Sequence, residues 1–173
     1  VSKLEKAEKL LLPGVGNFKR GMENLEKKDL VNVLNQKVLN EQIPILGICL
    51  GMQLMTKFSE EGDVKGLGWV NAETKNFTHL INNKKIKIPH MGWNSIDILR
   101  KDKIFNNIRI DSLYYFVHKY FVSCNDKINI LSRTKYSSIF CSSFHKENIY
   151  GLQFHPEKSH DQGLQILKNF NSI

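Results

Sequence analysis

The feature that most constrains this chain is an apolar run, residues 44–53, that passes through Gly47, Cys49 and Gly51 in the pattern Gly-x-Cys-x-Gly. This pattern is typical of a nucleophile elbow, in which a buried strand turns sharply into a helix and presents its nucleophile at the turn. The flanking glycines let strand and helix approach closely and leave room for a substrate at the sulfur. The helix N-terminus favours the thiolate. The pattern predicts an α/β fold with Cys49 as nucleophile.

A second motif, Phe154-His155-Pro156-Glu157, lies far downstream. Residues i and i+2 of an extended segment point to the same side. The Glu157 carboxylate can therefore accept from one imidazole nitrogen of His155 while the other nitrogen faces Cys49. Without the elbow, His155 would be interpreted as the end of a strand and Glu157 as a solvated charge. With the elbow, the spacing predicts a Cys49–His155–Glu157 triad.

A glycine-containing turn follows the apolar stretch at residues 10–12 and has the sequence Pro13-Gly14-Val15-Gly16. Backbone N–H groups of such a turn, together with that of Leu50, are candidates for holding an oxyanion. Gln53 lies one helical turn after Cys49. Its spacing fits a residue that lines the acyl pocket and a surface glutamine equally well.

Hydrophobic periodicity predicts one α/β domain over residues 1–173. Buried strands are expected at 10–12 and 43–48, and helices at 19–42, 50–58 and 160–170. The order strand, helix, strand, helix implies a parallel sheet covered on both faces. Residues 88–94 are expected to form a loop. The second half is rich in strands, expected at 70–77, 86–88, 114–122, 128–131, 138–144 and 150–154, with turn signals at 82–83 and 125–126.

Charge and cysteine content narrow the function classes. The net charge is +8, but the lysines are scattered among acidic residues, which favours a solvated surface over nucleic-acid binding. No apolar run reaches the ~20 residues that span a bilayer, and no signal segment opens the chain. The 3 cysteines are too few for a disulfide scaffold and suit a reducing compartment. A cytoplasmic protein without metal or cofactor is expected, since no Cys/His spacing resembles a zinc site.

Taken together, these motifs resemble those of the class I (triad) glutamine amidotransferases, over nearly the whole chain. Within that family, the segments Pro89-His90-Met91-Gly92-Trp93-Asn94 and Tyr115-Phe116-Val117-His118 are similar to the glutaminase subunit of imidazole glycerol phosphate synthase. The resemblance implies a flavodoxin-like mixed sheet with flanking helices. It also implies that glutamine is hydrolysed through a thioester on Cys49, with His155 as base and Glu157 orienting it.

The resemblance assigns further residues. Oxyanion and glutamine binding fall to Gly14, Val15, Gly16, Leu50, Gln53, His118, Lys119 and Tyr120. The ammonia is expected to pass to a (β/α)₈-barrel cyclase subunit in a heterodimer, which makes imidazole glycerol phosphate and AICAR. Glutaminase activity is expected to be weak until that partner is loaded. The matching interface positions are Trp93, Tyr115 and Lys158.

Three departures from the family pattern leave more than one function open. About one strand–helix unit, ~30 residues, is expected to be absent before Leu10, which would expose a sheet edge. Lys119 stands where a small hydroxyl residue is usual. Residues 66–73 resemble paralogues that supply ammonia for amidation of a bacterial surface-polysaccharide sugar. A non-catalytic binding module and a stand-alone cysteine hydrolase are also compatible with the sequence. Fast alkylation of Cys49 would argue against the binding module.

Overall fold

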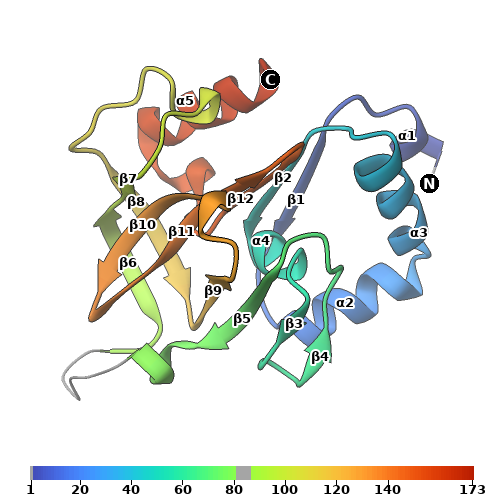
Figure 1. Cartoon of the computed structure of the whole chain (residues 1–173), viewed down its shortest axis with the longest axis horizontal. Helices are drawn as coiled ribbons and strands as arrows, with labels where there is room; N and C mark the ends of the chain where they lie inside the picture. Colours follow the sequence, from blue (N-terminus) through green and yellow to red (C-terminus); the bar gives the residue numbers. More distant parts are fainter. Residues whose placement is uncertain (1, 81–86) are drawn as a thin grey trace.

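A mixed, curled sheet forms the centre of the computed structural model, which describes residues 2–80 and 87–173 (Figure 1). Strand β2 (Ile45–Cys49) lies between two parallel neighbours, β1 (Leu10–Gly14) and β12 (Ile149–Leu152). The sheet continues in the order β11 (Ser138–Lys146), β9 (Tyr120–Cys124), β5 (Ala72–Asn76), β3 (Phe58–Ser59) and β4 (Val64–Lys65). Each neighbouring pair from β12 onward is antiparallel except β5 and β3. The expected α/β fold is confirmed. Among residues 2–80 and 87–173, parallel pairing is limited to the strands around the elbow and to the pair β3–β5.

Two smaller groups of strands complete the fold, one joined to this sheet and one separate from it. Strand β10 (Ile130–Tyr136) pairs with β11 and with the short β7 (Asp97–Ile98). A separate antiparallel pair is formed by β6 (His90–Ser95) and β8 (Leu113–His118). Within that pair side chains alternate, so His90 and His118 are buried while Trp93 is 44% exposed.

Helices cover both faces of the central strands, as the alternation along β2 requires. Ile45 packs in one core cluster with side chains of α2 (Phe18–Lys27) and α3 (Leu30–Asn35). Its neighbour Leu46 points the other way, into a second cluster with α5 (His160–Asn171). Two further α-helices are short, α1 (Ser2–Glu5) and α4 (Leu50–Leu54).

The helix expected at 19–42 is wrong as one element. It breaks at Asp29, whose φ of 53° is left-handed, and after α3 the chain forms a π-helical turn, Gln36–Asn40. The helix expected at 50–58 ends already at Leu54, and β3 begins at Phe58. In both places apolar side chains continue at helical spacing, so hydrophobic periodicity alone does not reveal the break.

The strand predictions also need correction. Residues 90–94 of the expected loop belong to β6, which pairs along its length with β8. The single strand expected at 114–122 is two strands, separated at Lys119. A strand is also expected at 86–88. Residues 87 and 88 do not form a strand, and residue 86 lies outside the described residues. The turn at 82–83 also lies outside them.

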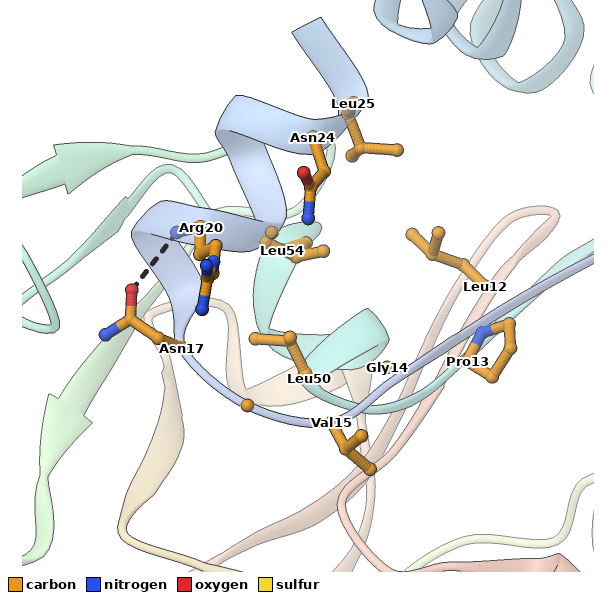
Figure 2. Close-up of a pocket in the computed structure, with 12 residues that line it drawn as sticks. Leu12, Pro13, Gly14, Val15, Asn17, Arg20, Asn24, Leu25, Leu50 and Leu54 are labelled. Carbon is orange, nitrogen blue, oxygen red and sulfur yellow. Dashed lines mark hydrogen bonds between the residues drawn. The ribbon is translucent and has the colours of Figure 1, made fainter. Parts of the chain in front are cut away.

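Strand β1 forms an open edge of the sheet. In the described part of the chain it pairs only with β2, and its Leu11 is 56% exposed. Beside it a pocket of about 380 Å³ lies between β1, α2 and α4. Leu12, Leu50 and Leu54 give this pocket an apolar wall, while Arg20 and Asn24 approach it from α2 (Figure 2). No helix of the described residues has the length and apolar character to cross a membrane.

Candidate active site

Cys49 sits on a strained strand-to-helix turn, as the sequence predicts. It is the last residue of β2 and has φ 51° and ψ −106°. A Cβ on Gly51 would lie 1.6 Å from the backbone oxygen of Leu12, and one on Gly47 would lie 2.7 Å from the nitrogen of Met52. Only glycine at both positions lets β1, β2 and α4 approach this closely.

His155 and Glu157 follow the adjacent parallel strand, β12, so they lie at the carboxyl ends of the strands, as Cys49 does. Leu152 pairs with Ile48, so the residues after β12 emerge beside Cys49. The ring of His155 is buried, and its Nδ1 lies 2.7 Å from Oε1 of Glu157. Its Nε2 is buried without a hydrogen-bond partner in the described residues. The imidazole is therefore oriented by Glu157, with one nitrogen left to exchange a proton.

The sulfur of Cys49 lies between a hydrogen-bond acceptor and a donor. The thiol donates to the carbonyl of Val117 at 3.8 Å, and the side-chain amide of Gln153 donates to the sulfur at 3.7 Å. Burial raises the pKa of the thiol to about 11, and the Glu157 charge adds to this. The N–H of Leu50 and the Gln153 amide lower the pKa, but by less than burial raises it. The N–H of Leu50 at the helix N-terminus thus favours the thiolate, as expected, but burial outweighs it and leaves the thiol protonated at neutral pH.

Slow alkylation of Cys49 at neutral pH is the first expected result. Because the reactive species is the thiolate, its rate of reaction with iodoacetamide should rise about tenfold for each pH unit and level off only near pH 11. Mass spectrometry of the peptide that contains Cys49 measures this rate separately from those of Cys124 and Cys141. A rate already level at pH 7 would contradict the buried, protonated thiol.

A pocket of about 280 Å³ opens at Cys49. It gathers the predicted residues from three segments, 15–16, 50–53 and 118–120. Gly14, which ends β1, lines the neighbouring pocket instead (Figure 2). Glu61, Pro89 and Val117 also line the pocket at Cys49. Pro89 and Val117 belong to segments that resemble the family, but none of the three is an expected site residue. The full lining is Val15, Gly16, Cys49, Leu50, Gln53, Glu61, Pro89, Val117, His118, Lys119 and Tyr120.

The carbonyl of Tyr120 organises one wall of this pocket. It accepts from Nε2 of Gln53 at 3.0 Å and lies 2.7 Å from Nδ1 of His118. Since a carbonyl only accepts, Nδ1 of His118 carries a hydrogen. Its Nε2 then accepts from Nδ1 of His90 at 3.0 Å. The side chains of Gln53 and His118 therefore both bind the Tyr120 carbonyl. This holds the backbone of residues 118–120 in place along the pocket.

The two histidines of this wall, His90 and His118, are neutral. Burial lowers the pKa of His90 to about 4 and that of His118 to about 3, and a positive charge on either ring would disfavour the other. The unfolded chain titrates both near 6.5. Below that pH the unfolded state therefore binds more protons, and stability falls as the pH falls toward 4.

The pH dependence of stability follows from this titration. The free energy of unfolding should drop by about 1 to 2 kcal/mol per buried histidine between pH 7 and pH 5. Urea unfolding at the two pH values measures the drop. His90→Gln should reduce it. An equal drop in the wild type and the His90 variant would contradict the assignment.

The predicted interface residues form one cluster on the outer side of the β6–β8 pair. The rings of Trp93 and Tyr115 meet edge to face at 5.9 Å, and Nζ of Lys158 lies 5.6 Å from the Tyr115 centroid. His160, which no sequence motif marks, stacks on Trp93 at 4.7 Å. Tyr115 also reaches the triad, because its carbonyl accepts from the N–H of His155 at 2.9 Å.

Within the described residues, no group of three or more His, Cys, Asp or Glu side chains could hold a metal ion. The thiol of Cys49 opens onto a pocket, and the imidazole of His155, oriented by Glu157, follows the adjacent strand. This combination suits nucleophilic attack on a carbonyl carbon.

Comparison with known proteins agrees with this geometry. The family model for class-I glutamine amidotransferases matches residues 2–172. Subunit HisH 2 of imidazole glycerol phosphate synthase from Methanococcus maripaludis is 53% identical over 167 residues, which cover 96% of this chain and 81% of that protein. Subunit HisH 1 from Campylobacter jejuni is 45% identical over 168 residues, which cover 96% and 82%.

Solved structures share the fold at lower identity. A glutamine amidotransferase gives a TM-score of 0.72 at 14% identity, covering 98% of this chain and 82% of that chain. The glutaminase domain of Trypanosoma brucei CTPS with bound acivicin gives 0.65 at 19% identity, covering 99% and 74%. The chain belongs to the class I glutamine amidotransferase family and, within it, is related to the HisH subunits of imidazole glycerol phosphate synthase.

Proposed function

We propose that this chain hydrolyses glutamine to glutamate and ammonia through a thioester on Cys49. The observation that carries this proposal is the opening of a pocket at an elbow cysteine, with the His155–Glu157 pair emerging from the neighbouring strand. Nε2 of His155 takes the proton of the thiol as the sulfur attacks the side-chain amide carbon. The same proton then goes to the leaving ammonia, and water releases glutamate from the thioester.

The developing oxyanion needs donors on the far side of the reacting carbon. The N–H groups of Val15, Gly16 and Leu50 are the candidates, since all three residues line the pocket with Cys49. Gly16 has φ +107°, a conformation that L side chains rarely adopt, so its backbone can turn an N–H where other residues cannot. Gly14 supports this loop by packing against Leu50 at the end of β1.

The pocket also suits the other end of a free amino acid. Glu61 supplies a carboxylate for the α-ammonium group, and Lys119 supplies an ammonium group for the α-carboxylate. Tyr120 and the backbone after His118 contribute the wall between them. Charges of both signs at the rim favour a zwitterion over a peptide, which argues against a general peptidase.

We further propose that the cluster of Trp93, Tyr115, Lys158 and His160 docks a (β/α)₈-barrel cyclase subunit in a heterodimer. Aromatic side chains that are partly exposed are enriched at such interfaces. Trp93 and Tyr115 of this cluster lie on the β6–β8 pair, which also contacts the site through the carbonyls of Val117 and Tyr115. Docking can therefore change the positions of both Cys49 and His155. The ammonia would be used by the cyclase to form imidazole glycerol phosphate and AICAR.

We assign this activity to the cytoplasm, which the three free cysteines support because a reducing compartment preserves thiols. The experiment that tests the function is an assay of glutamate release by the purified chain, alone and with a cyclase subunit and its nucleotide substrate. Release from glutamine that increases with the loaded partner supports the proposal. Equal release from γ-glutamyl peptides without a partner would instead support a stand-alone hydrolase.

A further inference from the structure

Gln153 is a fully buried polar side chain for which the mechanism above has no role. It follows β12 directly and lies two residues before His155. Its amide nitrogen donates to the sulfur of Cys49 at 3.7 Å, and its amide oxygen accepts from Nε2 of Gln53 at 3.1 Å. A buried amide within hydrogen-bond reach of the reacting sulfur can act on the chemistry as well as on the fold.

A chain of hydrogen bonds that begins at the Tyr120 carbonyl fixes the orientation of the Gln153 amide. The carbonyl of Tyr120 can only accept, so the group of Gln53 that faces it must be the NH₂. That same NH₂ donates its second hydrogen to Gln153, which must therefore present its oxygen to Gln53 and its own NH₂ to Cys49. The donor and the acceptor of each hydrogen bond in this chain are therefore determined, and its last donor is an N–H of Gln153 that points at the sulfur.

The carbonyl at which this chain of hydrogen bonds begins is itself held from the other side. His118 and Gln53 together use both lone pairs of the Tyr120 oxygen. His118 is held in turn by His90, and Nε2 of His90 lies 3.3 Å from the amide nitrogen of Asn94. Asn94 belongs to β6, next to Trp93. The orientation of Gln153 is thus connected to the strand that carries Trp93 of the proposed docking cluster.

We propose that Gln153 is a further catalytic residue, whose amide N–H stabilises the negative sulfur of Cys49. This inference deepens, and rests on, the proposed function. When the S–H bond breaks, the proton forms a bond to Nε2 of His155 and the electron pair stays on the sulfur. The sulfur then faces the Val117 carbonyl, to which it no longer donates, and the Glu157 charge. The N–H groups of Gln153 and Leu50 offset this repulsion.

Gln153→Met tests the proposal, since methionine keeps the length of the side chain and removes the donor. The pH profile of Cys49 alkylation should shift to higher pH, and kcat/KM for glutamate release should fall about ten- to hundredfold, mainly through kcat. Ser132→Ala is the matched control. Ser132 is also fully buried and loses side-chain hydrogen bonds, to Ser142 and Ser143, but should leave the alkylation profile where it is.

A second variant covers the case in which Gln153→Met does not fold. Gln153→Glu keeps the shape and places a carboxylate beside the sulfur, so it should shift the alkylation profile further in the same direction. Circular dichroism checks the fold of each variant. An unchanged profile in a folded variant of Gln153 overturns the inference. Because alkylation reports on the thiolate directly, this result does not depend on glutamate release, whose absence from the wild type would count against the proposed function alone.

Discussion

Cys49→Ala is expected to abolish glutamate release, by at least about 10⁴-fold, because no other described residue that lines the pocket can form the thioester. The substitution removes only a sulfur atom at the N-terminus of α4. The outer side of β6 and β8 is untouched, so binding to the cyclase subunit should remain. Glutamate production followed by a coupled dehydrogenase measures the loss, and titration calorimetry measures the binding.

Cys141→Ala is the matched control for this experiment. It makes the same chemical change at a buried free cysteine away from the pocket, whose sulfur accepts a hydrogen bond from Cys124 and donates one to the carbonyl of Ser143. It should lower stability modestly and leave glutamate release within about twofold of the wild type. Retained activity in the Cys49 variant would refute the assignment of the nucleophile. Lost partner binding would refute the separation of the two surfaces.

Gly51→Ala is expected to destabilise the protein by several kcal/mol and to abolish activity with it. Its new Cβ would lie 1.6 Å from the carbonyl oxygen of Leu12 and 2.7 Å from the carbonyl carbon. Both are backbone atoms of β1, which is paired with β2 along its length. Strand and helix must therefore separate, and the elbow that holds Cys49 opens. Urea unfolding of the purified variant measures the loss.

Gly21→Ala separates this clash from the general effect of adding a methyl group. At that position in α2 the closest atom is the side-chain Cδ2 of Leu54, at 3.1 Å, which can turn away. Alanine also favours a helix interior by about 1 kcal/mol over glycine. The Gly21 variant should stay within about 1 kcal/mol of the wild type. Equal stability of the two variants would contradict the close packing of β1 on α4.

The parts of the site that the sequence predicts are those encoded locally. Gly47, Cys49 and Gly51 specify a turn that only one backbone geometry satisfies, and His155 and Glu157 are close enough in sequence to meet across a single proline. Their hydrogen bond in the structure follows from the i, i+2 spacing. These short patterns need no knowledge of the rest of the fold.

Features that depend on tertiary packing escape prediction from the sequence. Local signals favour a loop where β6 lies, because proline and glycine stand close together there, and the segment is a strand because β8 pairs with it. Asp29 interrupts a periodic apolar pattern with a left-handed φ that no local signal marks. Pairing and helix breaks of this kind are set by distant contacts, which override local preference.

The same limit applies to chemistry. The pKa of Cys49 is governed by burial, which raises it to about 11 and outweighs the helix terminus that the sequence shows. Glu61 enters the pocket from a turn far from any motif. Gln153 is different, since its position two residues before His155 gives the same i, i+2 signal that identifies Glu157.

The measurement that tests the central claim most directly is glutamate release from glutamine, with and without the cyclase subunit and its nucleotide substrate. Strong stimulation by the loaded partner is the predicted result, because the site of the isolated chain holds a protonated, buried thiol and the β6–β8 pair connects that site to the docking cluster. A folded chain that releases no glutamate under either condition would contradict the account.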